Sequence, residues 1–344
     1  MKAVLLAAGR STRTWPISRD IPKPLLPILG TPIIGYTIGG LRTVVDEWFI
    51  VVGNGADLVK AYLTETFPDV TMHFVDDVMQ GTGSALLQVA PMLADESFLV
   101  LNADDLYHPS DIRALAESAS PNAGLAKTVS DPERFGIYTL EKDKPVALVE
   151  KPKNSVSKYA NAGAYKFHTD IFAHELTLSP RGEYEIVEYI NYLFSEGQEF
   201  ALSEVQGYWL PVTYPWDVLV AQRYFMSQAD IAYRVDPSAE VDDSVFLGKN
   251  VYVGKGCRIG AEVELENVCL MDGVHVGDYV RLHDCVLAPG VTVKSDTLVT
   301  PKAGEHLLPI AAKEPVLITP QFSGAFVANN ETLEGYVDGP IFIG

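Results

Sequence analysis

An apolar residue recurs at every sixth position late in the chain, and this repeat constrains the fold more than any other feature. The series runs through Val235, Val241, Leu247, Val253, Ile259 and Leu265. A companion series four residues later runs through Val245, Val251, Cys257 and Val263. After a slip near residues 271–275, the spacing resumes at Val276, Leu282 and Ala288. Short repeats of this kind are typical of solenoids, because stacked repeats bury one continuous apolar core.

The six-residue spacing is lost near the end of the chain. Residues 295–337 have no clear period and are predicted to be irregular, whereas the final GPIFIG resembles the start of a further coil. The repeat could therefore be part of a longer solenoid. Because an open solenoid end must be covered by the tail or by another subunit, we expect a homo-oligomer.

Before residue 232 the pattern differs, because strand-like apolar runs alternate with helical periods. The clearest pairs of strand and helix are 48–53 with 57–67, 71–75 with 82–93, and 97–102 with 110–119. This alternation predicts an α/β domain whose mostly parallel sheet is covered on both faces. Hairpin-like strands and two helices follow at 136–140, 146–150, 183–194 and 216–229. We therefore expect two domains, 1–231 and 232–344.

Composition restricts the partners and the compartment. The net charge is −19, from 45 acidic and 26 basic residues, which argues against nucleic acid or an anionic membrane surface as the main partner. No apolar run reaches the about 18 residues of a transmembrane helix, and the expected compartment is the cytoplasm. Cys257, Cys269 and Cys285 have no metal-like spacing and are predicted to be buried structural thiols.

The chain begins with an apolar strand pattern that breaks into a loop. Gly9 lets the backbone approach a ligand closely, and the hydroxyls of Ser11 and Thr12 suit phosphate oxygens. Arg13 offers a permanently charged fork, and prolines on both sides stiffen the backbone at Lys23. These features predict a site for a nucleoside triphosphate. The alternative is an ordinary turn between strand and helix with incidental charges.

Residues 9–24, GRSTRTWPISRDIPKP, resemble the signature of the sugar-1-phosphate nucleotidylyltransferases, GXGTRXXPX(T/S) followed by PKP. The matching residues are Thr12, Arg13, Pro16, Ser18, Pro22, Lys23 and Pro24. Ser11 replaces the second glycine. The resemblance, strongest to glucose-1-phosphate thymidylyltransferases and uridylyltransferases, implies a Rossmann-like, mostly parallel mixed sheet flanked by helices. The six-residue repeat itself resembles the hexapeptide repeat of left-handed parallel β-helices, and this second resemblance implies the left-handed sense.

The same resemblance assigns the nucleotide to several parts of the chain. The implied contacts are Leu6, Ala7, Gly9, Ser11, Thr12, Arg13, Asp76, Gln80, Gly81, Thr82 and Asp104. In relatives, the loop that matches residues 80–82 lies beneath the base. Relatives that use UTP or dTTP often have a glutamine where this chain has Asp76, and an ionised carboxylate accepts hydrogen bonds but cannot donate them. UTP or dTTP is favoured, and Gln80 offers a substitute amide.

Two carboxylates match the magnesium ligands of the family. Asp104 and Asp105 follow the apolar run FLVLNA, and Mg²⁺ prefers carboxylate and phosphate oxygens. The resemblance assigns the metal to Asp104, leaves Asp105 as its neighbour, and supplies Asp217 as the second ligand. The structural alternatives are an acidic turn or a helix N-cap region before Ser110 for the first two residues, and a helix N-terminal acid for Asp217.

Further motifs match the elements that hold the sugar-1-phosphate. They contain Gly136, Glu150, Lys151, Asn161, Gly163 and Glu183. In relatives, the glutamate at the position of Glu150 accepts hydrogen bonds from sugar hydroxyls, and the lysine at the position of Lys151 approaches the sugar phosphate. The alternatives are an exposed ion pair at residues 150–151 and a helix cap at Glu183.

The implied reaction transfers a nucleotidyl group from a nucleoside triphosphate to a sugar-1-phosphate, with Arg13, Lys23 and Lys151 as catalytic residues. One alternative is a catalytically silent regulatory or assembly homologue, which the retained charged residues disfavour. Another is a bifunctional enzyme whose β-helix also acetylates an amino sugar, with His275 and His283 as candidate bases.

Overall fold

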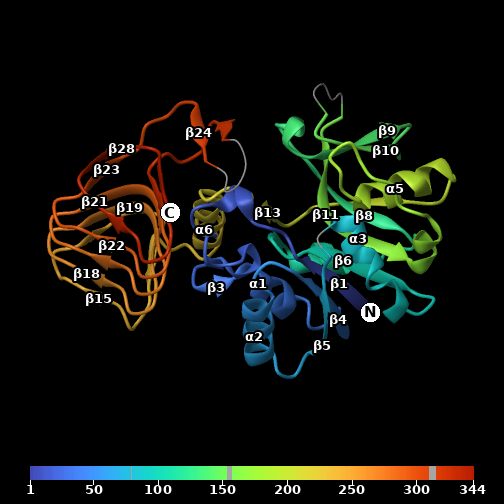
Figure 1. Ribbon diagram of the computed structural model, residues 1–344, viewed down its shortest axis with the longest axis horizontal. Coiled ribbons are helices and arrows are strands. Elements are labelled where there is room, and N and C mark those ends of the chain that lie inside the picture. Colours follow the sequence, from blue (N-terminus) through green and yellow to red (C-terminus); the bar gives the residue numbers. More distant parts are fainter. Residues whose placement is uncertain (79, 153–156, 310–314) are drawn as a thin grey trace. The chain divides into compact units, whose positions relative to one another are not determined.

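A computed structural model describes residues 1–78, 80–152, 157–309 and 315–344 of the protein (Figure 1). The chain forms two compact units. We call residues 1–10 and 34–209 the sheet unit, and residues 11–33 and 210–344 the β-helix unit. Segment 11–33, which carries most of the signature, therefore belongs with the C-terminal part of the chain and not with the sheet from which it emerges.

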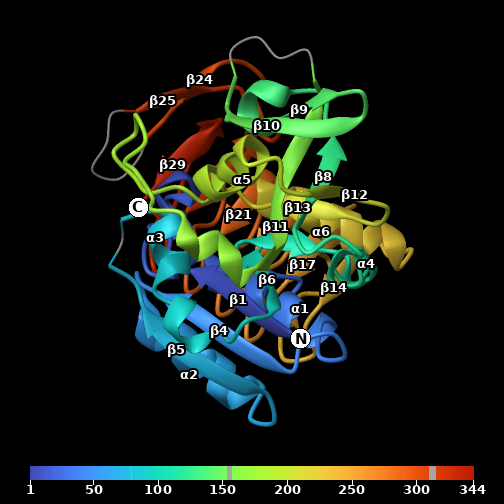
Figure 2. The ribbon, with the colours of Figure 1, turned by 90° about the vertical axis from the view of Figure 1, so that its right-hand side faces the viewer.

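The sheet unit is built around a mixed sheet. Its strands are β1 Lys2–Ala7, β4 Glu47–Val52, β5 Thr71–Asp76, β6 Ser97–Asn102, β8 Ala123–Thr128, β9 Gly136–Glu141, β10 Lys144–Glu150, β11 Tyr159–His168 and β12 Ala201–Glu204. The strand order is β10-β9-β11-β6-β1-β4-β5, and β8 pairs with β11 and β12 off this path (Figure 2). Strands β6, β1, β4 and β5 are parallel, whereas β11, β9 and β10 pair antiparallel. The predicted α/β class is confirmed, and the hairpin-like strands form the antiparallel half.

Short helices connect these strands. They are α1 Ile33–Gly40, α2 Ala56–Thr66, α3 Thr82–Leu87, α4 Pro109–Ala116 and α5 Ile186–Ser195. A separate two-stranded sheet pairs β7 Asp105–Tyr107 with β13 Trp209–Pro211. Strands β1, β4 and β6 are almost wholly apolar and buried. This is expected of parallel strands that are covered on both faces.

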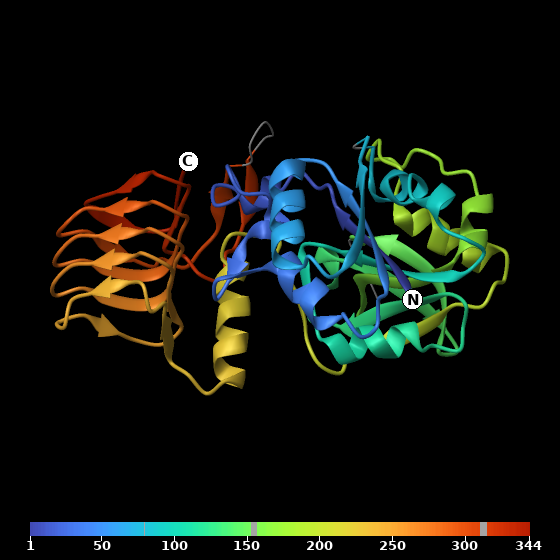
Figure 3. The ribbon, with the colours of Figure 1, turned by 90° about the horizontal axis from the view of Figure 1, so that it is seen from below.

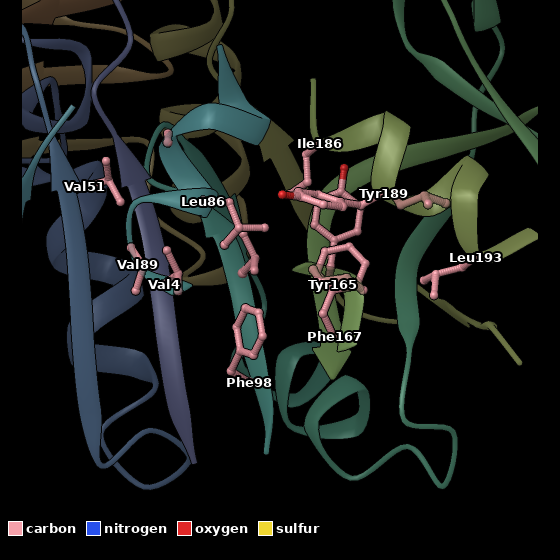
Figure 4. Packing of buried hydrophobic residues seen from close by; sticks show 14 of the residues in the cluster. Val4, Val51, Leu86, Val89, Phe98, Tyr165, Phe167, Ile186, Tyr189 and Leu193 are labelled. Carbon is pink, nitrogen blue, oxygen red and sulfur yellow. The ribbon is translucent and has the colours of Figure 1, made fainter. Parts of the chain in front are cut away.

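One face of the sheet packs against α3 and α5. The buried side chains of α5 recur every three or four residues, including Ile186, Tyr189 and Leu193, so that one helix stripe faces the sheet. Figure 4 shows this stripe beside Phe98 of β6 and Phe167 of β11. Burial of these large side chains fixes α5, and the chain segment before it, relative to the strand ends.

The β-helix unit contains three-sided parallel coils that stack on one another (Figure 3). Strands of the first side are β14 Tyr233–Val235, β17 Val251–Val253, the ends of β19 Glu264–Leu270 and β21 Arg281–Leu287, β26 Ala325–Val327 and β29 Ile341–Ile343. The second side holds β15 Glu240–Val241, β18 Arg258–Ile259, β20 His275–Val276, β22 Thr292–Val293 and β27 Thr332–Leu333. The third holds β16 Phe246–Leu247, the starts of β19 and β21, β23 Leu298–Thr300 and β28 Tyr336–Asp338. The parallel β-helix is confirmed; its left-handed sense stays a prediction.

The repeat slips at a coil corner and not at residues 271–275. Corners between the third and first sides turn on the left-handed residues Asn250, Asn267 and Asp284. The corner that holds Asn267 is one residue shorter than the one before it, and the next corner keeps the shorter length. Leu270 therefore pairs with Leu287, which replaces Ala288 as the continuation of the inward-facing series. A six-residue count misses this change, because it occurs at a corner.

Much of the stretch predicted to be irregular is regular. Residues 295–337 include β23, β26, β27 and β28, and residues 310–314 lie outside the described part. A hairpin of β24 His306–Leu308 and β25 Val316–Ile318 separates β23 from β26 and hides the period. The final strand β29 pairs in parallel with β26, so the last residues extend the β-helix as predicted.

The first side of the β-helix packs against helix α6, Asp217–Gln228. Gln222 is fully buried, and its Nε2 donates to the carbonyl oxygens of Asn250 at 2.8 Å and Val268 at 3.1 Å. The ring of Trp216, just before the helix, lies 5.9 Å from that of Phe326 on β26. Helix α6 is therefore fixed to the β-helix by both polar and aromatic contacts.

Candidate active site

The carboxyl ends of the parallel strands in the sheet unit bring predicted nucleotide contacts together. Leu6 of β1 pairs with Asn102 of β6, and the amide of Ala103 donates to the Leu6 carbonyl at 3.1 Å. Ala7 ends β1, and a Cβ added to Gly9 would meet nothing within 4 Å. The chain thus leaves open space beside the Gly9 backbone, at the sheet edge where ligands of such folds bind.

The two aspartates after β6 differ in their surroundings. Asp105 is only 7% exposed, and its Oδ2 accepts from Tyr107 Oη at 3.3 Å and from Trp209 Nε1 at 3.4 Å. Burial raises the pKa of the Tyr107 phenol well above its usual value, and the charges of Asp105 and Asp104 act in the same direction. Tyr107 therefore remains a donor, and Asp105 is a structural carboxylate. Asp104 is half-buried, which keeps it the better metal-ligand candidate.

Hydrogen bonds join the predicted base loop, residues 80–82, to the predicted sugar loop, residues 182–185, and to the start of α5 directly after it. The amide of Tyr184 donates to the carbonyl of Gln80 at 2.9 Å, and the amide of Ile186 donates to Thr82 Oγ1 at 3.1 Å. Gly81 has a φ of 119°, and a Cβ there would come within 2.4 Å of the Tyr184 carbonyl oxygen. Only glycine fits this approach, so the loop geometry accounts for the Gln-Gly-Thr motif.

Asp76 lies on the surface at the end of β5. Its side chain is 80% exposed, and the carboxylate receives a hydrogen bond of 2.8 Å from Lys60 Nζ on α2. Gln80, the proposed substitute amide, is also exposed. The side chain that departs from the family pattern is therefore held by a neighbouring helix in this structure.

Asn161 and Gly163 occupy an irregular turn in β11, where its register with β8 shifts. Asn161 Nδ2 donates to Tyr165 Oη at 2.6 Å, and Asn161 Oδ1 accepts from the Gly163 amide at 3.1 Å. Gly163 has a φ of 69°, and a Cβ on it would lie 2.2 Å from Asn102 Nδ2. The sugar-side turn therefore lies directly against the carboxyl end of β6.

Glu150 ends β10 and Lys151 follows it, beside a cation that the sequence interpretation missed. Arg181 Nη1 lies 3.7 Å from Glu150 Oε1, and Arg181 also binds both carboxylate oxygens of Glu185, at 3.0 and 2.8 Å. Burial would raise the pKa of Glu185, but hydrogen bonds from Arg181 and Ser179 outweigh it and hold that pKa below its usual range. The only signal for Arg181 was its place directly before the Gly-Glu-Tyr-Glu motif.

The remaining sugar-side residues flank this pair. A Cβ added to Gly136 would lie 3.0 Å from Glu150 Oε2, so this glycine makes room for the carboxylate. Lys151 has a positive φ of 45°, and its Nζ lies 3.9 Å from Glu150 Oε1. Glu183 is exposed, and its carbonyl oxygen accepts from the Ser179 amide at 3.0 Å.

In the β-helix unit, the signature loop is closed around Ser11. The Ser11 carbonyl oxygen accepts from Thr14 Oγ1 at 2.9 Å and from Ser18 Oγ at 2.8 Å, and Ser11 Oγ accepts from the Lys23 amide at 3.1 Å. Ser11 has a φ of 56°, a left-handed value that explains why the family pattern has glycine here. The serine takes the strained conformation and adds a bond that glycine lacks.

The charged residues of this loop differ in exposure. Arg13, in the short turn Thr12–Thr14, is exposed, whereas Lys23 is only 9% exposed. Asp217, at the first turn of α6, accepts at Oδ2 from the amides of Thr213 and Tyr214, both at 2.7 Å. Asp217 is therefore an acidic residue at a helix N-terminus, as the structural alternative predicts. Its metal-binding role stays a prediction.

The predicted site residues are thus divided between the two units. The β-helix unit carries Ser11, Thr12, Arg13, Lys23 and Asp217. The sheet unit carries the others, which are Leu6, Ala7, Gly9, Asp76, Gln80, Gly81, Thr82, Asp104, Gly136, Glu150, Lys151, Asn161, Gly163 and Glu183.

Other candidate groups lie elsewhere. Among the described residues, the side chains clustered closely enough to hold a metal are Asp95, His168 and Asp170, at the amino end of β6, opposite the edge that carries Asp104. His275 is exposed on the second side of the β-helix, and His283 is half-buried near a corner. No helix in the described ranges is both long and apolar enough to cross a membrane.

All three cysteines are free and buried, as predicted. Burial raises the pKa of the Cys257 thiol to about 11 and that of the Cys285 thiol to about 12. These thiols are therefore protonated at neutral pH and act as apolar core residues of the β-helix.

Residues 2–224 match the nucleotidyl transferase family, and residues 231–305 match a domain described as the GMPPB C-terminal domain. The bifunctional protein GlmU of Methanococcus maripaludis is 34% identical over 233 residues, which cover 66% of this chain and 55% of the relative. A bifunctional sugar-1-phosphate nucleotidylyltransferase/acetyltransferase of Sulfurisphaera tokodaii is 30% identical over 232 residues, with 65% and 55% covered. The chain thus spans about half the length of these curated relatives.

Two further proteins match over most of their own length. The UTP–glucose-1-phosphate uridylyltransferase AglF of Haloferax volcanii is 28% identical over 227 residues, which cover 63% of this chain and 93% of the relative. A crystal structure provisionally described as a glucose-1-phosphate thymidylyltransferase of Bacillus anthracis, in complex with sucrose, superimposes with a TM-score of 0.59 and 25% identity. It covers 65% of this chain and 94% of the other. Because the family match spans well over half of its residues, the chain belongs to the nucleotidyl transferase family.

Proposed function

We propose that this protein transfers a nucleotidyl group from a nucleoside triphosphate to a sugar-1-phosphate and releases pyrophosphate. The proposal depends chiefly on one observation within the sheet unit. The Gly9 loop follows β1, and the sugar-side turn at residues 161–163 lies against the end of β6, the strand that pairs with β1. The base loop at residues 80–82 is hydrogen-bonded to the loop that holds Glu183. Two substrates that must react with each other require such neighbouring loops.

In the proposed reaction, a phosphate oxygen of the sugar-1-phosphate attacks the α-phosphorus of the triphosphate. A new P–O bond forms as the P–O bond to pyrophosphate breaks, and no covalent enzyme intermediate is needed. Arg13 would stabilise the leaving pyrophosphate, Lys23 the charge on the α-phosphoryl group, and Lys151 the attacking phosphate. Catalysis of this kind rests on positioning and charge neutralisation.

Nucleotidyl transferases generally use a divalent metal, and we propose Mg²⁺, held by Asp104 and Asp217. Both are carboxylates, the ligand class that Mg²⁺ prefers. Asp104 is half-buried and follows β6, which pairs in the sheet with β1, the strand before the Gly9 loop. The ion would neutralise phosphate charge that a chain of net charge −19 otherwise repels.

The proposed substrates are UTP or dTTP and glucose-1-phosphate or a related hexose-1-phosphate. The uridylyltransferase and thymidylyltransferase among the similar proteins support this choice. We further propose a cytoplasmic homo-oligomer in which another subunit covers an open end of the β-helix.

A matrix of nucleoside triphosphates against sugar-1-phosphates tests the proposal, with pyrophosphate release as the readout and Mg²⁺ present or chelated. We expect release that depends on both substrates and on the metal. Absence of release with every pair would favour the catalytically silent homologue. Consumption of acetyl-CoA with glucosamine-1-phosphate, measured on the same protein, would instead reveal the bifunctional alternative.

A further inference from the structure

Arg19 joins the signature loop to a late coil of the β-helix. Its Nη1 bonds the carboxylate of Glu331, its Nη2 donates to the carbonyl oxygen of Asn329 at 2.7 Å, and its Nε donates to Asp20 at 2.9 Å. The first two partners lie more than 300 residues away along the chain, at the corner after β26. All three guanidinium nitrogens are therefore engaged.

The partner side of this contact is fixed by main-chain bonds. The amide of Thr292 donates to the Glu331 carbonyl oxygen at 3.0 Å, and the amide of Asn330 donates to the Pro289 carbonyl oxygen at 3.0 Å. A Cβ on Gly290 would come within 2.2 Å of Asn330 Oδ1, so the corner lies closely against the coil before it. Arg19 thus binds a corner whose position the β-helix determines.

The loop side leads directly to the predicted catalytic residues. Ser18, the neighbour of Arg19, donates to the Ser11 carbonyl at 2.8 Å, and Ser11 accepts from the Lys23 amide at 3.1 Å. The Arg19 amide donates to the Pro16 carbonyl at 3.0 Å within the same loop. A shift of Arg19 would therefore move the turn that carries Arg13 and the backbone of Lys23.

We propose that Arg19 and Glu331 are positioning residues, through which the β-helix holds the signature loop in the shape that binds the triphosphate. This assignment rests on the proposed function. Neither residue touches substrate in this account; both act through Ser18 and Ser11 on Arg13 and Lys23. The β-helix is then part of the support for the triphosphate side of the reaction.

Removal of an ordinary surface ion pair would change the free energy of unfolding little, because such pairs typically contribute about 0–1 kcal/mol. The same β-helix contains a matched example, Arg281 with Glu264, in which Nε and Oε2 are 3.3 Å apart and the arginine side chain is 65% exposed. The Arg19 side chain is 32% exposed, and it adds the Asn329 carbonyl to its carboxylate partner. The fork geometry distinguishes Arg19 from this control.

The test compares Arg19→Ala, Arg19→Lys and Glu331→Gln with Arg281→Ala as the matched control. Hydrogen–deuterium exchange of residues 11–23 reports the shape of the loop without any substrate. Steady-state kinetics with varied triphosphate and varied sugar-1-phosphate give kcat and the KM for each substrate. A smaller folded fraction would lower the apparent kcat but leave both KM values unchanged, so a selective change in one KM separates positioning from stability.

We expect Arg19→Ala to speed exchange in residues 11–23, to raise the KM for the triphosphate and to lower kcat/KM on the order of tenfold. Arg19→Lys keeps the charge but loses the fork, so its defect should be smaller, while Arg281→Ala should match the wild type. Wild-type exchange and wild-type KM for the triphosphate in both Arg19→Ala and Glu331→Gln would overturn the assignment. If the wild type itself releases no pyrophosphate, the proposed function fails, and the exchange measurement alone decides whether Arg19 holds the loop.

Discussion

The two units hold their parts of the proposed site by different means. In the sheet unit, glycines and main-chain bonds set the loops, as at Gly81 against the carbonyl oxygen of Tyr184. In the β-helix unit, side chains close the signature loop, chiefly the hydroxyl of Ser11 and the guanidinium of Arg19. A backbone contact tolerates no added atom, whereas a side-chain contact can be weakened in steps. The two sides should therefore respond differently to substitution.

Arg13→Ala tests whether the side-chain-held loop carries the chemistry. Loss of a preorganised cation at a developing phosphate charge should lower kcat on the order of 100-fold or more. Pyrophosphate release under saturating substrates measures it, and Arg258→Ala on the second side of the β-helix is the matched control. A turnover number near that of the wild type would remove Arg13 from the mechanism and shift the chemistry to the sheet unit.

Gly81→Ala tests the backbone-held side against a matched glycine. Both Gly81 and Gly182 have positive φ, 119° and 74°, but a Cβ would meet the Tyr184 carbonyl oxygen at 2.4 Å in the first case and nothing within 4 Å in the second. Gly182→Ala should cost only the backbone strain, roughly 1–2 kcal/mol. Gly81→Ala should cost about 2 kcal/mol more, because the loop must also move.

Urea unfolding of both variants measures this difference. Equal losses of unfolding free energy would mean that the contact between the base loop and the sugar loop is loose. The backbone would then not be what sets the sheet-unit side of the site.

Gln222→Leu tests the polar attachment of α6 to the β-helix. Gln222 is fully buried and donates to two carbonyl oxygens, which the leucine would leave without this donor. The expected loss is about 1 kcal/mol of unfolding free energy, the usual net contribution of a hydrogen bond, because the Asn250 carbonyl oxygen keeps the Val268 amide as a donor. Gln228→Leu, at an exposed position near the end of the same helix, should change stability by less than about 0.5 kcal/mol. Thermal unfolding of the two variants measures the difference. Equal losses of stability would show that the helix is held by its apolar contacts alone.

Local patterns were sufficient for the elements that bury a regular face. Buried strands such as β4 and β6 appear as apolar runs, and the helix predicted at 183–194 is α5, Ile186–Ser195. Its start is three residues late, because residues 183–185 are held in a loop by bonds to Gln80 and Thr82. These partners are about 100 residues away, which no local pattern records.

Long-range contacts explain the other differences between prediction and structure. The coil shortening at Asn267 follows from the pairing of neighbouring coils, and the hairpin between β23 and β26 interrupts a repeat that continues beyond it. Arg181 and Arg19 were missed because each gains its role from carboxylates placed by folding. The signature predicted which residues share a motif, but not that segment 11–33 packs with the C-terminal part of the chain.

Ser11 combines a strained backbone conformation with a side-chain hydrogen bond, and we expect its substitutions to have the smallest effects. Ser11→Ala keeps the left-handed φ of 56° and loses the acceptor for the Lys23 amide, so it should cost about 1 kcal/mol. Ser11→Gly also loses the acceptor but relieves strain of similar size, so its unfolding free energy should stay within about 0.5 kcal/mol of the wild type. Urea unfolding of the pair separates the two terms. If the glycine variant were as unstable as the alanine variant, strain at this position would be negligible, and the family's glycine would have to be explained by close approach to the triphosphate instead.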